Sequence, residues 1–403
     1  MKVVQINAVY EYSSTGRNTS EFHQFLIDKG HNSFVFCCNI NKPENNVFRV
    51  GCKADYKIHA LLSRIFGRQA LFSTIATQAL INKLKVISPD VVLLGNLHAN
   101  YINLPMLVNF LARNNIPTVL VLHDCWFFTG HCCHYVEDDC YKWLTKCGHC
   151  PSLGKYNTSI LWDNSGRNYE MKKRLFHRIE RLGVVGVSDW ITNEATKSPV
   201  LQDAKIIKRI YNWIDLDVFK PNLSPDLRER YGFSKDDFIV LGVSQEWSKA
   251  KGFDQMIELS KRKKDIKVLI VGYTGKEQTV NDNLYLIRPT QSVYELVDYY
   301  SIADVLLNCS IQETFGKVAA EALACGTPII ANDATANPEI AVRGCGFVIH
   351  NNSMDDIIES IDKIKESGKA FYSENCLSKA RNDFSKEINL NSYLSFFHEL
   401  IKL

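Results

Sequence analysis

The sequence predicts an α/β protein with two doubly wound, Rossmann-like domains. At 403 residues the chain is longer than a single hydrophobic core usually supports. Short β-branched runs alternate with longer amphipathic stretches, which is typical of parallel strands joined by crossover helices. The strand candidates are continuous apolar runs rather than alternating ones, as expected for strands that are covered on both faces.

Eleven segments are predicted strands: residues 3–7, 33–38, 91–96, 118–124, 183–188, 238–244, 267–272, 284–287, 304–310, 328–332 and 346–349. A non-periodic stretch, residues 210–221, separates the first five from the other six. We therefore expect an N-terminal domain at 1–210 and a C-terminal domain at 211–384. Residues 385–403 form an amphipathic pattern and are expected to be a last helix that packs back toward the first domain.

The composition limits the class of protein. A hydrophobic content of 46% with 23% charged residues indicates a folded globular chain. The formal net charge of +3 is too small to indicate a nucleic-acid partner. The N-terminus begins as a strand rather than as a secretory signal, and no apolar run reaches the ~18 residues of a membrane span. The expected location is the cytoplasm.

The stretch IQETFGKVAAEALACGTPII, residues 311–330, predicts a loop and a helix after a strand. Glu313 precedes the helix and Glu321 lies in its second turn. Free backbone N–H groups at the helix start are suited to binding a diphosphate. Glu321 would then accept hydrogen bonds from a ribose, and Glu313 from a sugar. The alternative is two surface charges on an ordinary unit. The remaining candidate donor contacts here are Thr314, Phe315, Gly316, Lys317 and Val318.

Residues 313–339 resemble the donor-site signature of retaining GT-B glycosyltransferases of family 4. The shared features are two glutamates separated by seven residues, an aromatic-glycine pair after the first, and a later Pro-Glu. The resemblance extends through residues 210–221 and 301–310 and covers nearly the whole chain, and it is to bacterial members that build surface polysaccharides. It implies the GT-B fold with an interdomain cleft, a nucleotide-sugar donor held largely by the C-terminal domain, and an acceptor held by the N-terminal domain.

The function expected from this resemblance is that of a retaining, hexosyltransferase-type enzyme. Its donor is a UDP- or GDP-sugar and its acceptor a polysaccharide or a lipid-linked oligosaccharide, with no cofactor required for catalysis. The mechanism that the family implies is attack on the face that the nucleotide leaves, where the leaving phosphate helps to deprotonate the acceptor. Two alternatives stay open: an inactive sugar-binding or zinc-containing scaffold, and a nucleotide-sugar epimerase of the same fold.

Cations for the diphosphate are expected in the loop 244–254, which follows the first strand of the second domain and includes Ser244. The family carries an arginine five positions before a Lys-Gly pair. Lys251 and Gly252 match that pair, but Glu246 stands at the arginine position. Lys249 is the candidate substitute. Arg288 is either a further donor-site cation or a solvated strand end.

The N-terminal domain offers candidates at two strand ends. Gly16 and Arg17 follow the first strand, in a segment (13–22) expected to lead into a helix, and are candidates for contacts to the diphosphate or the acceptor. The resemblance implies that His123 binds the transferred sugar and supports the transition state, while Asp124 either orients it or caps a turn. His123 and Glu313 are the catalytic candidates.

Thirteen cysteines include a cluster within residues 125–151. Cys147 and Cys150 have the C-x2-C spacing of a zinc half-site, and Cys132 (or Cys133) with Cys140 completes four thiolates in a candidate structural zinc site. His131, His134 and His149 are alternative ligands. The other interpretations are reduced buried thiols and disulfides that form on oxidation.

Two basic stretches, residues 57–72 and 167–183, combine cations with apolar residues. Both lie in the predicted acceptor domain. They are either solvated helix faces or surfaces for reversible contact with anionic lipid at the inner face of the cell membrane.

Overall fold

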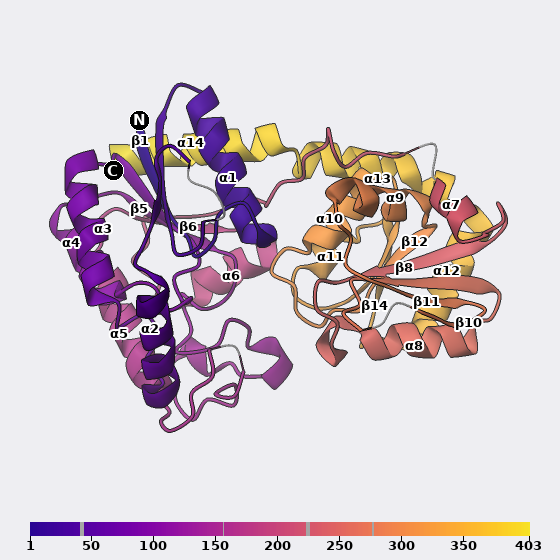
Figure 1. Cartoon of the computed structure of the whole chain (residues 1–403), viewed down its shortest axis with the longest axis horizontal. Coiled ribbons are helices and arrows are strands. Elements are labelled where there is room, and N and C mark those ends of the chain that lie inside the picture. The colour runs from indigo at the N-terminus through magenta and orange to yellow at the C-terminus, as the bar shows by residue number, and fades with distance from the viewer. Residues whose placement is uncertain (41–43, 156, 223–225, 276–277) are drawn as a thin grey trace. The chain divides into compact units, whose positions relative to one another are not determined.

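The computed structural model describes residues 1–40, 44–155, 157–222, 226–275 and 278–403 (Figure 1). The chain forms two compact units, and each is described by itself below. The first unit comprises Met1–Ile210 with Leu390–Leu403, and the second comprises Tyr211–Asn389.

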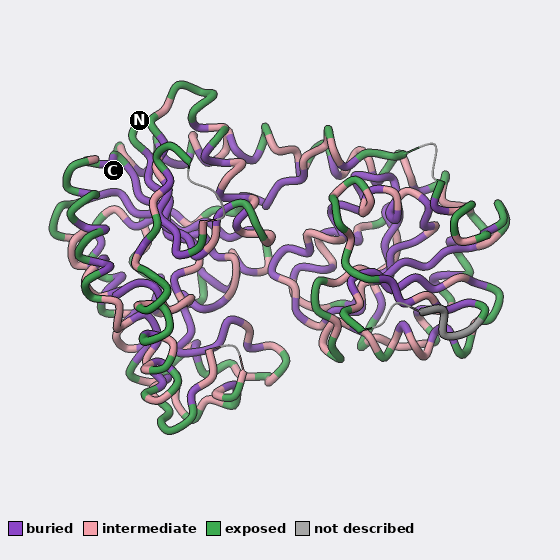
Figure 2. The backbone as a smooth tube through the Cα atoms, viewed as in Figure 1, coloured by how far each residue is buried: buried purple, intermediate pink, exposed green. Residues whose placement is uncertain are grey.

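The first unit contains a seven-stranded sheet in the order β3-β2-β1-β4-β5-β6-β7, in which every described strand pair is parallel. The strands are β1 (Lys2–Ile6), β2 (Asn32–Cys37), β3 (Val47–Arg49), β4 (Val91–Leu94), β5 (Thr118–Leu122), β6 (Leu182–Gly186) and β7 (Ile206–Arg209). The helices are α1 (Ser13–Asp28), α2 (Lys53–Phe66), α3 (Thr74–Ile87), α4 (Leu104–Arg113), α5 (Ser165–Phe176) and α6 (Asp189–Lys197). The central strands β4, β5 and β6 are buried along their whole length (Figure 2).

The last helix, α14 (Lys386–Lys402), contributes its later turns to this unit. A Cβ atom on Gly183 of β6 would lie 2.7 Å from the Phe396 ring, so the glycine lets the helix approach the strand closely. The rings of Phe22 and Tyr393 lie 5.0 Å apart and join α1 to α14.

The second unit contains a seven-stranded sheet in the order β10-β11-β9-β8-β12-β13-β14. Only β10 runs antiparallel among the described strands. The strands are β8 (Phe238–Val243), β9 (Ile266–Val271), β10 (Gln278–Asn281), β11 (Leu284–Ile287), β12 (Val305–Asn308), β13 (Ile329–Asn332) and β14 (Gly346–Ile349). The helices are α7 (Asp226–Arg230), α8 (Phe253–Arg262), α9 (Val293–Ile302), α10 (Lys317–Ala324), α11 (Asn337–Ile340), α12 (Met354–Ser367) and α13 (Lys369–Asp383).

The predicted doubly wound α/β fold is confirmed, and each of the eleven predicted strands is present to within a few residues at its ends. The strands that the sequence did not reveal are β3, β7 and β10, all at sheet edges. β3 has three residues, and β7 has the sequence IIKR with two exposed cations. Short strands with charged residues are typical of edges, where the apolar pattern fades. No helix in the described parts of the chain is long and apolar enough to span a bilayer.

Candidate functional site

The loop between β12 and α10 is fixed by the loop that follows the neighbouring strand β13. The Glu313 backbone N–H donates to Thr335 Oγ1 at 2.8 Å, and the Glu313 carbonyl accepts from the Ala336 N–H at 3.1 Å. Both loops lie at the carboxyl ends of adjacent parallel strands, which is where ligands bind in sheets of this kind. Two hydrogen bonds of its own backbone therefore fix the position of Glu313.

Helix α10 begins behind a left-handed glycine. Gly316 has φ 87°, which favours glycine, and its carbonyl accepts from the N–H groups of Ala319 and Ala320. Lys317 and Val318 are half-buried, and their N–H groups precede those first intrahelical bonds. The helix start therefore presents N–H groups of the kind that bind a phosphate.

The two residues before Gly316 face inward. The Phe315 ring is buried against the rings of Tyr211 and Phe384, at centroid distances of 6.0 and 5.4 Å, so Phe315 can offer a ligand its backbone but not its ring. Thr314 is also buried, and its Oγ1 has no hydrogen-bond partner among the described residues. A buried hydroxyl without a partner costs about 1–3 kcal/mol, which a ligand or water could recover.

Lys251 forms an ion pair with Glu313. Its Nζ lies 2.5 Å from Glu313 Oε1 and 3.3 Å from Ser310 Oγ. The neighbouring Gly252 has φ 80°, and a Cβ atom there would lie 2.3 Å from Cys309 Cβ. The glycine of the Lys-Gly pair thus lets the 3₁₀ turn Lys249–Lys251 pack against the end of β12, which brings Lys251 to Glu313.

The other cations predicted for the donor, Lys249 and Arg288, are exposed, and neither forms an ion pair with Glu313 among the described residues. Glu246 is exposed as well. Ser244 donates through Oγ to the Glu246 carbonyl at 2.8 Å and so shapes the loop after β8. Lys251 is therefore the predicted cation that the geometry supports best.

Glu321 is not a surface charge. It is 2% exposed, and its Oε2 accepts a hydrogen bond from the Tyr300 hydroxyl at 3.0 Å. Tyr300 lies in α9, and Lys369 donates to the carbonyls of Ser301 and Ala303 at the end of that helix, at 2.8 and 2.7 Å. A carboxyl buried among the alanines of α10 needs polar partners, and Tyr300 supplies one.

In the first unit, His123 is half-buried directly after β5. Of the two roles considered for Asp124, the described contacts show the turn cap: Asp124 Oδ1 accepts from the Trp126 N–H at 2.8 Å. Its Oδ2 pairs with His98 Nε2 at 2.9 Å. Burial acts to raise the pKa of Asp124, but the His98 imidazole and the Trp126 N–H outweigh it and lower that pKa to about 2. The sequence did not indicate His98; its place just after β4, the strand next to β5, was the available signal.

Gly16 and Arg17 lie within the first turns of α1, because the helix already begins at Ser13 rather than after a longer loop. The Glu11 N–H donates to the Gly16 carbonyl at 3.0 Å, and a Cβ atom on Gly16 would lie 3.2 Å from Val9 Cγ2. Gly16 thus has a packing role, since it lets the loop after β1 fold against α1. Arg17 is half-buried at the start of that helix.

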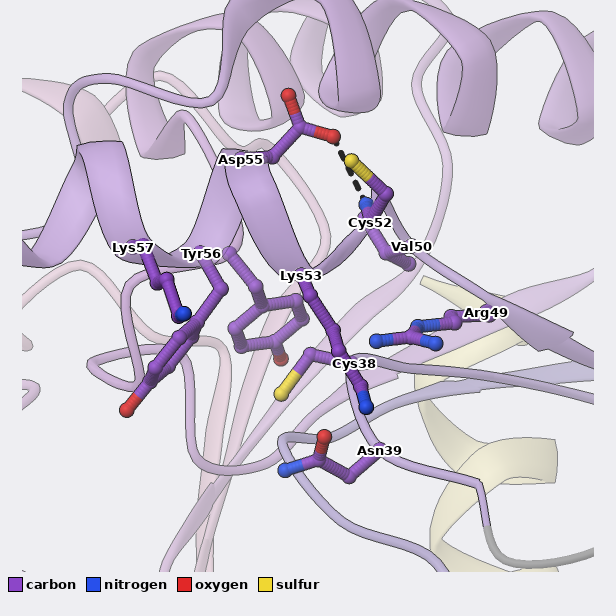
Figure 3. Close-up of a pocket in the computed structure, with 10 residues that line it drawn as sticks. Cys38, Asn39, Arg49, Val50, Cys52, Lys53, Asp55, Tyr56 and Lys57 are labelled. Atoms are coloured by element: carbon purple, nitrogen blue, oxygen red, sulfur yellow. Dashed lines mark hydrogen bonds between the residues drawn. The ribbon is translucent and has the colours of Figure 1, made fainter.

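A cavity of about 220 Å³ opens at the carboxyl ends of β2 and β3 (Figure 3). Three cations line it together with two tyrosines: Arg49, Lys53, Lys57, Tyr56 and Tyr101. Asp55 also lines it, but its carboxylate accepts the Cys52 N–H at 2.8 Å and caps α2. The sequence did not predict this cavity, because its walls come from separate segments.

The two sheets and their order define the class of protein as one with the GT-B fold. A glycosyltransferase from Rickettsia africae is similar over 100% of this chain and 98% of its own, with a TM-score of 0.71 and 16% identity. An Anabaena protein, HepE in complex with UDP and glucose, is similar over 99% of this chain and 100% of its own, with a TM-score of 0.68 and 15% identity.

A family model matches part of the sequence. Residues 224–387, which lie within the second unit, match the family described as "Glycosyl transferases group 1". A D-inositol 3-phosphate glycosyltransferase of Mycobacterium sp. (strain JLS) is 29% identical over 183 residues, which is 42% of this chain and 41% of the relative. The match thus spans less than half of that relative's length.

Proposed function

We propose that this protein is a retaining glycosyltransferase that moves a hexose from a UDP- or GDP-sugar to a polysaccharide or lipid-linked oligosaccharide. The observation that carries the proposal is the arrangement around the start of α10, where Lys251 meets Glu313 and Glu321 is buried one helix turn further on. The residues that match the group 1 family, 224–387, include all three. A protein of the same fold binds UDP and glucose, which supports this donor class.

In the proposed complex each group has a separate task. The N–H groups at the start of α10 and the Lys251 ammonium bind the donor diphosphate, whose negative charge grows as the sugar departs. Glu321 accepts hydrogen bonds from the ribose and Glu313 from the sugar. The leaving phosphate takes the proton from the acceptor hydroxyl, so neither glutamate has to transfer a proton, and His123 supports the sugar.

A nucleotide screen tests the donor class. At a concentration 100 times its Kd, a ligand that binds only the folded state stabilises it by about 2.7 kcal/mol. We therefore expect UDP or GDP, and the matching nucleotide sugar, to raise the melting temperature by several degrees, whereas free hexoses do not. Release of nucleotide from the donor in the presence of acceptor measures turnover.

The alternatives give different results. A hexose that stabilises the protein when no nucleotide does would indicate the sugar-binding scaffold. A change in the sugar of the nucleotide sugar without transfer would indicate the epimerase.

Helix α2 supports the proposal of a membrane-bound acceptor, because it buries polar side chains and exposes apolar ones. Its buried residues are His59 and Ser63, whereas Ile58 and Leu61 are 59% and 58% exposed. At its C-terminal end the exposed Phe66 stacks on Trp162 at 5.4 Å, and Ile160 and Leu161 are exposed beside that tryptophan in the sequence. An exposed apolar surface of this kind indicates an apolar partner.

The charge of the surrounding residues supports an anionic membrane as that partner. Lys53 and Lys57 of the same helix line the 220 Å³ cavity, and Arg64 is exposed further along α2. We assign the cavity to the diphosphate of a lipid-linked acceptor and the apolar residues of α2 to the lipid surface.

The other predicted lipid-binding stretch, residues 167–183, does not have this character. Lys172 is 1% exposed and donates to the carbonyls of Trp126 and Thr129, while Leu175 and Phe176 are buried. The apolar residues of α5 are thus packed into the first unit rather than available to lipid.

The variant Ile58→Ser/Leu61→Ser tests the α2 surface. Partial burial of the two side chains in lipid contributes about 2 kcal/mol, so their loss should weaken binding to phosphatidylglycerol vesicles about 30-fold. Cosedimentation at low and high salt measures this binding. Val86→Ser, on an 85% exposed valine of α3, is the matched control and should bind like the wild type. Equal sedimentation of all three proteins, or none at low salt, would contradict the assignment.

A further inference from the structure

Four cysteines converge on one small cavity in the segment that follows β5. Cys132, Cys140, Cys147 and Cys150 line a cavity of about 10 Å³. A space of that size holds about one water molecule or one ion and excludes any organic ligand. Cys132 and Cys150 both reach this cavity, although these residues are separated by 18 positions in the sequence.

The backbone near one of these cysteines donates to sulfur: Cys147 Sγ accepts the Gly130 N–H at 3.3 Å. Between Cys147 and Cys150, His149 is left-handed with φ 48°, so the chain turns sharply and brings both ends of the C-x2-C motif to the cavity. Backbone N–H groups that point at sulfur favour the thiolate, which is the form that binds metals.

A buried donor at the cavity has no acceptor. Trp143 lines the cavity and is 1% exposed, and its indole Nε1–H has no hydrogen-bond partner among the described residues. Buried polar groups are nearly always paired. A metal-bound thiolate is a strong acceptor and would satisfy this group.

The hydrogen bonds exclude His131 as a ligand. Trp126 Nε1 can only donate, so its bond to Gln69 Oε1 fixes the amide orientation and turns the Gln69 NH₂ group toward His131 Nδ1, at 3.0 Å. With Nδ1 accepting, the proton lies on Nε2, and neither nitrogen is available to a metal.

We propose that Cys132, Cys140, Cys147 and Cys150 bind one structural Zn²⁺ as four thiolates, with release of four protons to solvent. Of the other histidines considered, neither His134 nor His149 is among the residues that line the cavity. The two 3₁₀ turns Val136–Asp138 and Lys142–Leu144 are the regular elements of this segment, so a metal would supply the cross-link that a sheet or helix does not.

The sulfurs must move to close such a site. Among the described residues, the group whose ligand atoms all lie within 4.8 Å of one another is His98, Asp124 and Cys133, rather than the four cysteines. Rotation of cysteine side chains about χ1 can bring the thiols together in the metal-bound state. The His98 group already has an explanation without a metal, because His98 and Asp124 pair directly and Asp124 also accepts the Trp126 N–H.

Metal analysis of the full-length chain, purified in reducing buffer without chelator, tests the proposal. We expect one zinc per chain, and less than about a fifth of that in Cys140→Ser and in Cys147→Ser. Cys133→Ser is the matched control and should retain the full zinc content. Substitution with Co²⁺ should give the charge-transfer absorption of cobalt bound to thiolates in tetrahedral geometry.

A second measurement covers variants that fail to fold. Titration of the wild-type protein with a mercurial should release one equivalent of zinc as the ligand thiols react, measured with a chelating dye. Absence of zinc from protein with reduced thiols would overturn the proposal, as would intramolecular disulfides among the four cysteines. Loss of zinc in Cys133→Ser would also overturn the proposed ligand set, because it would make Cys133 a ligand, either in place of Cys132 or together with His98 and Asp124. These results are independent of glycosyl transfer, so the zinc site and the proposed function can fail separately.

Discussion

Replacing Glu321 by glutamine should lower kcat/KM for the nucleotide sugar about 100-fold. The proposed role of Glu321 is to accept two hydrogen bonds from the ribose, and each charge-assisted bond contributes about 1.5 kcal/mol. Because the ribose is remote from the bond that breaks, the loss should appear mainly in KM and in nucleotide affinity rather than in kcat. Steady-state kinetics with varied donor and the nucleotide-induced melting shift measure the two quantities.

Tyr300→Phe is the control for the buried environment of Glu321. It removes the hydroxyl that donates to Glu321 Oε2 at 3.0 Å but leaves the carboxylate, so donor affinity should fall about tenfold or less. The nucleotide-induced shift of each variant is measured from the melting temperature of the same variant without ligand, which separates lost stability from lost binding. A normal donor KM and a normal nucleotide shift in Glu321→Gln would contradict the assignment of this residue to the donor.

The strands that the sequence predicted most clearly are those that are buried in the fold. The central strands β4, β5, β8 and β9 are covered on both faces, and their continuous apolar sequences identify them without further information. The edge strand β7 exposes Lys208 and Arg209, so its sequence resembles a loop. The edge strand β10 pairs antiparallel across a short turn, which the pattern of alternating strands and helices did not suggest.

The candidate site was predictable only where its residues are close in sequence. Glu313 and Glu321 belong to one loop-helix unit, and the sequence located both. The contact of Lys251 with Glu313 depends on the close approach of Gly252 to Cys309, a packing distance that no local pattern encodes. The cationic cavity at Lys53 is formed by side chains from helix α2, from the end of β3 and from separate loops, so it became visible only in the folded chain.

Lys251→Met should reduce kcat/KM for the donor by about 10²–10³-fold, with most of the loss in kcat. The ammonium is proposed to stabilise charge that develops on the departing diphosphate, and removal of one such group typically costs that much. Methionine keeps the length of the aliphatic chain, so packing around Cys309 and Gly252 should be retained. Lys261→Met, on an exposed lysine of α8, is the control and should behave like the wild type.

In the absence of donor, the Lys251 ammonium is paired with Glu313. This pair is weak enough for a donor diphosphate to replace Glu313 as the partner of the ammonium. The Lys251 and Glu313 side chains are 36% and 23% exposed, so the pair contributes about 1 kcal/mol or less and is exchanged at little cost. Without Lys251, the negative charge of the Glu313 carboxylate is no longer neutralised and repels the donor phosphates. The double variant Lys251→Met/Glu313→Gln should therefore lose less than the sum of the single losses, because neutralising Glu313 relieves that repulsion. Strict additivity would show that the two residues act separately, and a larger loss in Lys249→Met than in Lys251→Met would transfer the phosphate contact to Lys249.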